Sequence, residues 1–147
     1  MTEHYMHPMK ILMSNVYALF TQVQGFHWNV KGHHFFQLHG FFEMVYKDLF
    51  EHIDTLAERI RACDDYAPGT LSDIHRLQEL EDSSEISLRE LKVVEIFIKN
   101  CETVISQGKS LWGMCEKSGD LVTQDILIDL VNHLEKYRWM AKSYMEK

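Results

Sequence analysis

Apolar residues recur every three or four positions along four long segments of the 147-residue sequence. The segments cover about residues 8–30, 34–63, 87–117 and 120–147, and this spacing places the apolar side chains on one face of a helix. The chain has two prolines and seven glycines, whereas an all-β domain needs many turns. The pattern therefore predicts an all-α domain with four long helices.

Local signals predict where these helices begin and end. We expect Pro8 at the first position of the first helix, where its missing N–H costs nothing, and Gly32 at the end of that helix. Ser87 and Glu90 predict a capping box at the start of the third long helix. Asp120 is expected to cap the fourth.

The connection between the second and third long segments is much longer than the other two. A turn-rich stretch around Pro68 leads into a predicted short helix at residues 71–80, with Ser72 as a possible N-cap, and residues 81–85 are expected to form an exposed loop. A connection of this length must cross the bundle. The expected fold is a ferritin-like four-helix bundle with a short helix in the crossover between helices two and three.

Composition excludes several classes of protein. The sequence has 15 basic and 22 acidic residues, and the resulting net charge of −7 repels phosphate backbones. The three cysteines form no CxxC pair, which argues against a thiolate zinc site, and free thiols suit a reducing compartment. No apolar leader or stretch of about 18 apolar residues occurs. We expect a cytoplasmic protein with no membrane contact, in which residues 1–7 form a short tail and residues 8–147 the bundle domain.

Two histidines flank the predicted turn between the first two helices. His27 lies five residues before Gly32 and His39 lies seven residues after it, so an antiparallel hairpin brings the two rings to similar depth. Imidazoles in this arrangement can bind a transition-metal ion. Each histidine taken alone is more often an ordinary polar residue than a metal ligand.

Asp54 and Glu58 form a carboxylate pair one turn apart on the second helix. Asp54 follows His39 by 15 residues, or about 22 Å along the helix axis, so one ion cannot contact both within one chain. Either they serve different sites or one site spans two chains. The 15 steps leave the two residues only about 60° apart around the axis. Two antiparallel copies of this helix about a two-fold axis would bring His39 of one copy near the carboxylates of the other.

A metal site within one subunit is not expected. Di-iron sites inside single bundles use Glu-x-x-His pairs on two helices, and the sequence contains no such pair. His52, His75 and His133 have no constellation of ligands around them in the sequence and are interpreted as structural or exposed residues.

Four runs of residues carry a family resemblance. They are HWNVKG at residues 27–32, FFxLHxxFExxY at residues 35–46, DxxAERI at residues 54–60 and LEKxxWM at residues 134–140. Together with the spacing of the histidines and carboxylates, these runs resemble the Dps family of mini-ferritins over nearly the whole chain.

The resemblance implies an iron-storage and detoxification ferroxidase that forms a dodecameric shell. Iron would be bound at each two-fold interface, two ions per inter-subunit site, by imidazoles of one subunit and carboxylates of its mate. Fe(II) would be oxidised there by hydrogen peroxide or oxygen, and the Fe(III) mineral would be stored inside the shell. The implied iron-binding residues are His27, His39, Asp54, Glu58, Glu43 and, as an outer ligand, His33. Zinc and cobalt could occupy the same ligands.

Further roles follow from the same resemblance. Asp120, Asp125 and Asp129 would line three-fold pores and raise the local concentration of cations. The simpler alternative for these aspartates is an N-cap plus solvated charge. Trp28 would intercept stray radicals beside the iron site, or else act as an ordinary packing residue.

DNA binding is the main alternative function. Family members that bind DNA commonly use a lysine-rich terminal extension, but the first nine residues of this sequence contain no Lys or Arg. With a net charge of −7, tight binding to phosphates is not expected. A DNA-binding nucleoid-compacting protein and a simple helical module that dimerises through its second helix remain as alternatives to the ferroxidase.

Overall fold

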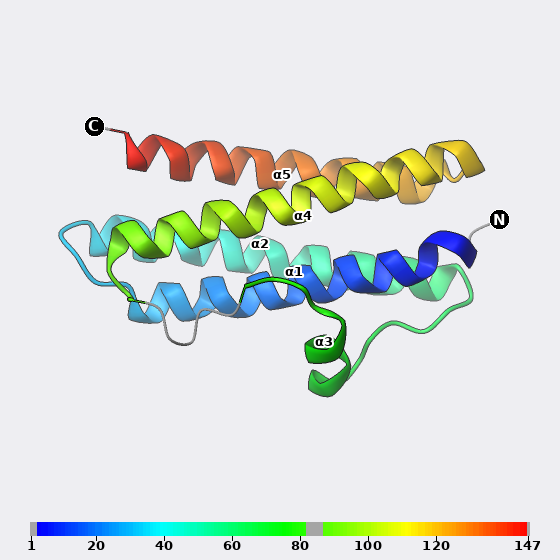
Figure 1. The fold of residues 1–147 in the computed structure, drawn as a ribbon, viewed down its shortest axis with the longest axis horizontal. Coiled ribbons are helices and arrows are strands. Elements are labelled where there is room, and N and C mark those ends of the chain that lie inside the picture. The colour runs from blue at the N-terminus through cyan, green and yellow to red at the C-terminus, as the bar shows by residue number, and fades with distance from the viewer. Residues whose placement is uncertain (1–2, 82–86, 147) are drawn as a thin grey trace.

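The computed structural model describes residues 3–81 and 87–146, and within them five helices form an all-α bundle. The helices are α1 (Glu3–Asn29), α2 (Phe35–Ala62), α3 (Leu71–Leu77), α4 (Glu90–Ser118) and α5 (Leu121–Met145). Figure 1 shows the four long helices side by side along the molecule, with the short α3 outside them in the crossover from α2 to α4. The predicted fold is confirmed.

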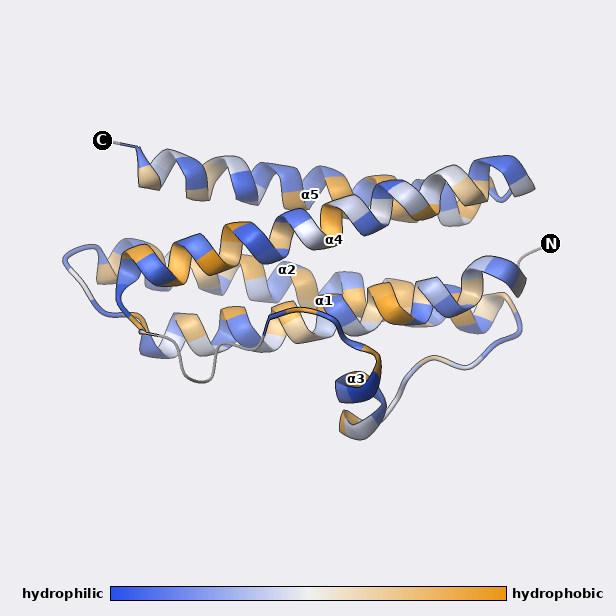
Figure 2. Cartoon of the chain, in the orientation of Figure 1, coloured by the Kyte–Doolittle hydropathy of each residue, from blue (hydrophilic) through white to orange (hydrophobic). Residues whose placement is uncertain are grey.

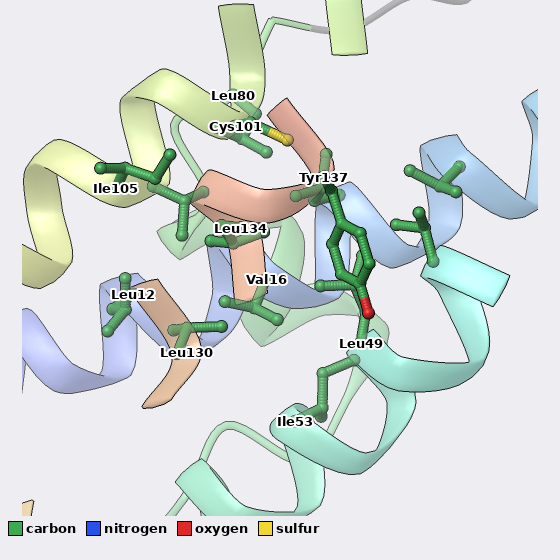
Figure 3. Packing of buried hydrophobic residues seen from close by; sticks show 14 of the residues in the cluster. Leu12, Val16, Leu49, Ile53, Leu80, Cys101, Ile105, Leu130, Leu134 and Tyr137 are labelled. Atoms are coloured by element: carbon green, nitrogen blue, oxygen red, sulfur yellow. The ribbon is translucent and has the colours of Figure 1, made fainter. Parts of the chain in front are cut away.

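The core lies between the two helical hairpins, α1–α2 and α4–α5. Hydrophobic and hydrophilic residues alternate along each long helix (Figure 2), so every helix has one apolar face to bury. In Figure 3, Leu12 and Val16 of α1, Leu49 of α2, and Leu130 and Leu134 of α5 meet in one cluster. The hydrophobic effect that holds these faces together fixes how α2 is rotated against its neighbours.

The first helix begins earlier than the sequence suggested. Residues 3–7, expected as part of a tail, already belong to α1, and Pro8 therefore lies inside the helix instead of at its first position. The physical reason is Tyr5, which is fully buried and donates a hydrogen bond of 2.5 Å from its hydroxyl to Asp120 Oδ2. Burial of this ring against α5 stabilises an extra turn of helix ahead of the proline.

The predicted start of α4 is also wrong. The N-cap is Arg89, which makes no capping hydrogen bond with its side chain, and Ser87 lies before the helix. The Glu90 carboxylate accepts hydrogen bonds from the backbone N–H and ring Nδ1 of His34, both 2.9 Å long, so it is not free to complete a capping box.

The turn between α1 and α2 is fastened to the start of α4. The Lys31 N–H donates to Leu88 O at 3.0 Å, and the Glu90 N–H donates to Lys31 O at 3.1 Å. Helix α1 ends at Asn29, so Gly32 lies in the turn and does not end the helix as expected. Gly32 has a φ of 153°, and a Cβ atom there would overlap the Glu90 carboxylate. Glycine is therefore required by this close approach.

The remaining helix starts agree only in part with the expectations. Helix α3 is capped by Thr70, whose hydroxyl accepts from the Asp73 N–H, and not by Ser72. The cap of α5 by Asp120 is confirmed, since its carboxylate accepts from the Thr123 N–H at 3.0 Å. Of the loop expected at residues 81–85, only Glu81 lies within the described residues, and it is exposed. None of the helices in the described part of the chain combines the length and apolar character that a membrane crossing requires.

Candidate metal sites

The α1–α2 hairpin brings the rings of His27 and His39 face to face. Their centroids are 3.8 Å apart and their planes differ by 10°. Nδ1 of His27 is 2.7 Å from the backbone oxygen of His39, and Nδ1 of His39 is 2.6 Å from the backbone oxygen of His27. A carbonyl oxygen only accepts hydrogen bonds, so both Nδ1 atoms carry the proton and both Nε2 atoms keep a lone pair. This is the tautomer that binds a metal ion through Nε2.

Aromatic neighbours hold these two rings in place. His27 is only 7% exposed and lies 5.3 Å from the ring of Tyr46, while Phe35 stacks on His39 at 5.0 Å. Trp28, next to His27 in the sequence, is 62% exposed. The imidazole pair is therefore packed between aromatic rings, while the residue next to it in the sequence reaches the surface.

Glu43 and His33, the other two predicted ligands, lie in different settings. Glu43 follows His39 by one turn of α2, is half-buried, and forms an ion pair of 3.2 Å with Lys47. His33 is exposed in the turn. The neighbouring His34, which the sequence analysis did not single out, is the one that contacts Glu90.

Asp54 and Glu58 lie further along α2, and both are exposed. A hydrogen bond with Asp54, together with its negative charge, raises the pKa of Glu58. Because α2 is one continuous helix from Phe35 to Ala62, Asp54 stays about 22 Å and Glu58 about 28 Å from His39 along the axis. A single chain therefore does not bring the predicted imidazoles and carboxylates together.

The face of α2 that carries Asp54 also carries exposed aromatic rings. Phe36 is 82% exposed and precedes Asp54 by 18 residues, which is five full turns, while Phe50 is 58% exposed and precedes it by about one turn. Phe50 also lines a hollow of about 430 Å³, together with Phe20, Gln24, Tyr46, Lys47 and Glu51. Large apolar side chains exposed on one face of a helix can mark a contact surface.

The three predicted pore aspartates differ in their surroundings. The Asp120 carboxylate caps α5 and accepts hydrogen bonds from Tyr5 and from Arg59 Nη2, the latter at 3.0 Å. Burial acts to raise the pKa of Asp120, but the hydrogen bonds from Thr123 and Tyr5 and the charge of Arg59 outweigh it and hold the pKa at about 2. Asp125 and Asp129 are exposed.

A further cluster, which the sequence analysis missed, lies between α2 and α5. His133 Nδ1 is 2.7 Å from Asp48 Oδ2, and His52 Nε2 is 3.1 Å from His133 Nδ1 and 3.3 Å from Asp48 Oδ2. Tyr137 donates a hydrogen bond of 2.5 Å from its hydroxyl to the same carboxylate oxygen. The interpretation of His52 and His133 as residues without a constellation is therefore wrong.

Burial sets the charge states in this cluster. Burial lowers the pKa of His52, although Asp48 acts in the opposite direction. Burial also acts to raise the pKa of Asp48, but hydrogen bonds from Tyr137 and His133 outweigh it and lower the pKa overall. A signal was present in the sequence, because Asp48 and His52, and also Asp129, His133 and Tyr137, are spaced four residues apart on helices.

Comparison with known proteins identifies the family. Residues 10–147 match the family model of the ferritin-like domain. DNA protection during starvation protein 2 of Bacillus anthracis is 32% identical over 130 residues, covering 88% of each chain, and a Helicobacter pylori protein named DNA protection during starvation protein is 30% identical over 93% of this chain and 95% of its own. The X-ray structure of Dps from Thermosynechococcus elongatus superposes with a TM-score of 0.95 at 27% identity, covering 99% of this chain and 92% of that one. The chain belongs to the Dps family of ferritin-like proteins.

Proposed function

We propose that this protein is a ferroxidase and iron store, which oxidises Fe(II) and keeps the Fe(III) mineral inside a dodecameric shell of identical subunits. The observation that carries the proposal is the His27–His39 pair, in which both Nε2 lone pairs are free for a metal ion. Membership of the Dps family supports it. Iron is here the substrate and the cargo of the protein.

The site is completed by a second copy of the chain. Two α2 helices packed antiparallel about a two-fold axis place Asp54 and Glu58 of one subunit against His27 and His39 of the other. The same packing covers the exposed Phe36 and Phe50, which lie on the Asp54 face of α2. Burial of these rings supplies apolar contact area that stabilises this two-fold interface between α2 helices, which we call the seam.

Each group has a distinct part in the reaction. The imidazoles and carboxylates, with Glu43 one turn from His39, bind two Fe(II) ions and stabilise the ferric charge that develops. Each Fe(II) gives up one electron, and one hydrogen peroxide takes both and becomes two hydroxide ions, so no hydroxyl radical leaves the site. Oxygen is the alternative oxidant. His33 acts as an outer ligand, and the exposed Trp28 is placed to intercept stray radicals.

Cations reach the interior at the start of α5. Asp125 and Asp129 are exposed there and raise the local cation concentration. Leu121, Val122 and Ile128 are also exposed at this end of the helix, which supports a subunit contact around the pore. Asp120 has a different role from the other two aspartates. Its hydrogen bonds with Tyr5 and Arg59 hold the start of α5 against α1 and α2.

The protein protects DNA by removing iron and peroxide and not by coating the duplex. The relatives from Bacillus anthracis and Helicobacter pylori are named for DNA protection. In this chain, however, the net charge is −7. Electrostatic repulsion therefore opposes phosphate binding. The three free thiols suit the reducing cytoplasm as the place of action.

The proposal is tested by Fe(II) oxidation with peroxide, followed by the absorbance of the ferric product. We expect His39→Asn to lower the rate by about tenfold to 100-fold, because it removes one ligand. His75→Asn, which changes an exposed histidine of α3, serves as the matched control and should leave the rate within about twofold. Equal rates in wild type and His39→Asn would overturn the proposal.

A further inference from the structure

We propose that Asp48, His52 and His133 form a second binding site, for a divalent transition-metal ion, which a single chain completes without a partner. Two of the ligands come from α2 and one from α5. One ligand atom from each residue lies within 4.8 Å of the other two. The site is independent of the proposed ferroxidase function, since it shares no residue with the seam.

The spacing of the three ligand atoms fits a metal coordination shell. Their separations are 2.7, 3.1 and 3.3 Å. Neighbouring ligands about 2.1 Å from a metal ion are about 3.0 Å apart in an octahedron and about 3.4 Å apart in a tetrahedron. The side chains are therefore already gathered at the distances that one face of such a shell requires.

Three donors converge on one oxygen of this cluster, because His133 Nδ1, His52 Nε2 and the Tyr137 hydroxyl all lie within 3.3 Å of Asp48 Oδ2. If His133 donates its Nδ1 proton to Asp48, it has no second proton to offer His52 Nε2, 3.1 Å away, and no lone pair with which to accept one, so His52 Nε2 donates to Asp48 Oδ2 at 3.3 Å instead. A cation among the three atoms would receive one lone pair from each residue once the two imidazoles carry their protons on the other ring nitrogen, which for His133 is the Nε2 that faces Asp129. Two imidazoles and one carboxylate favour Zn²⁺, Co²⁺ or Fe²⁺ over Mg²⁺ and Ca²⁺, which prefer oxygen ligands.

Neighbouring side chains hold two of the three ligands in hydrogen bonds and close polar contacts of the kind that orient metal-binding residues. His133 Nε2 is 3.5 Å from Asp129 Oδ1, so the ring's other nitrogen faces a carboxylate. Tyr137 extends from α5 towards α2 (Figure 3) and donates a hydrogen bond to the Asp48 carboxylate. Partners of this kind fix the orientation and raise the basicity of metal-binding side chains.

The cluster has an access route for ions. His52 borders a hollow of about 430 Å³ whose other lining residues include Asp125, Asp129 and Asn132. The two aspartates are exposed and attract cations, and the hollow leaves room for water to complete the coordination shell. An ion therefore reaches the cluster from the acidic start of α5.

The position of the cluster on α2 separates it from the seam. Asp54 follows Asp48 by six residues, which at about 100° per residue places the two about 120° apart around the axis. Asp48 faces α5, as its contacts with His133 and Tyr137 show, whereas Asp54 is exposed. Binding at the cluster therefore does not need a second copy of the chain.

The test is a Co²⁺ titration followed by visible absorption, in the intact oligomer of a variant that lacks seam ligands, His39→Asn/Asp54→Asn/Glu58→Gln. We expect about one Co²⁺ per chain, with the affinity lowered by about tenfold or more on adding His133→Asn or Asp48→Asn and unchanged on adding His75→Asn. Excess Mg²⁺ should not displace the Co²⁺.

Folding of each variant is checked by far-UV circular dichroism. If Asp48→Asn does not fold, the half-exposed His133 carries the test through His133→Asn. Absence of Co²⁺ binding in the seam-deficient variant, or binding that His133→Asn leaves unchanged, would overturn the proposal. Displacement of Co²⁺ by Mg²⁺ would overturn the assignment to a transition-metal ion. None of these outcomes depends on Fe(II) oxidation, so the two proposals fail separately.

Discussion

Helix α2 carries two sets of candidate metal ligands, one of which the fold brings together within a single chain while it keeps the other apart. The set of Asp48 and His52 meets His133 of α5 within one chain, at distances of 2.7 to 3.3 Å. The set of His39 and Asp54 is kept about 22 Å apart by the straight helix. Under the two proposals, one face of the helix carries a site that folding completes, and another face carries a site that assembly completes.

The largest expected effect is on Fe(II) oxidation, which should depend on the seam ligands and not on the cluster of Asp48, His52 and His133. Asp54→Asn combined with Glu58→Gln should lower peroxide-driven Fe(II) oxidation by about 100-fold, because both carboxylate ligands of the seam lose their charge. His133→Asn should leave the rate within about twofold. Stopped-flow absorbance of the ferric product measures both. A larger loss in His133→Asn than in the double variant would reverse the assignment of the two sets.

The next effect is on assembly, which only the seam site should require. Phe50→Glu places a charge on the exposed face of α2 that we expect to be buried at the seam, where an unpaired charge is costly. We expect smaller oligomers in size-exclusion chromatography and oxidation slowed by about tenfold or more. Binding of Co²⁺ to Asp48, His52 and His133 should be retained.

Phe50→Leu keeps the seam apolar and serves as the control for this substitution. It should preserve both the oligomer and the oxidation rate. An unchanged oligomer in Phe50→Glu would show that this face of α2 is not buried by a partner.

A smaller effect concerns the end of the bundle that holds His27 and His39. A hydrogen bond from the ring of His34, with further ones from its backbone N–H and from Tyr144, outweighs burial and holds the pKa of Glu90 at about 2, below its ordinary value of 4.5. A lowered pKa in the folded state stabilises the fold above pH 4.5, and this contribution is lost as the pH falls towards 2. Glu90→Gln should therefore reduce the free energy of unfolding by about 1–2 kcal/mol at pH 5 and by progressively less below it.

Urea unfolding of wild type and Glu90→Gln at pH 5, 4 and 3 measures this difference. Glu95→Gln changes an exposed residue of α4 and is the matched control. A difference that grows as the pH falls from 5 to 3 would contradict the sign of the pKa shift.

The smallest expected effect is on DNA. Neither set of ligands offers a basic surface, and the net charge of −7 repels phosphates. We expect no retention of plasmid DNA in a gel shift at neutral pH and about 0.15 M salt. Retention that disappears on raising the salt concentration would show direct phosphate contacts and favour the nucleoid-compacting alternative.

Features that depend on the local spacing of apolar residues, such as the long helices, could be predicted from the sequence. Features that depend on contacts between distant residues, such as the starts of α1 and α4, could not. The apolar spacing of Leu38, Phe42, Val45 and Leu49 predicted a helix with one buried face, and all four are buried. The capping box of α4 failed because Glu90 is held by His34, which is 56 residues away. The early start of α1 depends on Tyr5, whose partner Asp120 is 115 residues away.

The same distinction applies to the candidate sites. His27 and His39 could be paired from the sequence because a short turn joins their helices, and the structure stacks their rings. For His52 and His133, the four-residue spacings on each helix were visible in the sequence. Their meeting could not be predicted, because the two residues are 81 positions apart and are brought together by the packing of α2 against α5. The pairing of His39 with a partner's carboxylates stays a prediction, since it depends on assembly.

Mixed oligomers test most directly the central claim that the oxidation site is shared between two chains. Subunits carrying His27→Asn/His39→Asn are unfolded, mixed in equal amounts with subunits carrying Asp54→Asn/Glu58→Gln, and reassembled. If each site takes imidazoles from one chain and carboxylates from the other, random mixing restores about a quarter of the sites. We predict about a quarter of the wild-type Fe(II) oxidation rate in the mixture, while each variant reassembled alone stays inactive. A mixture as inactive as its components would contradict the account.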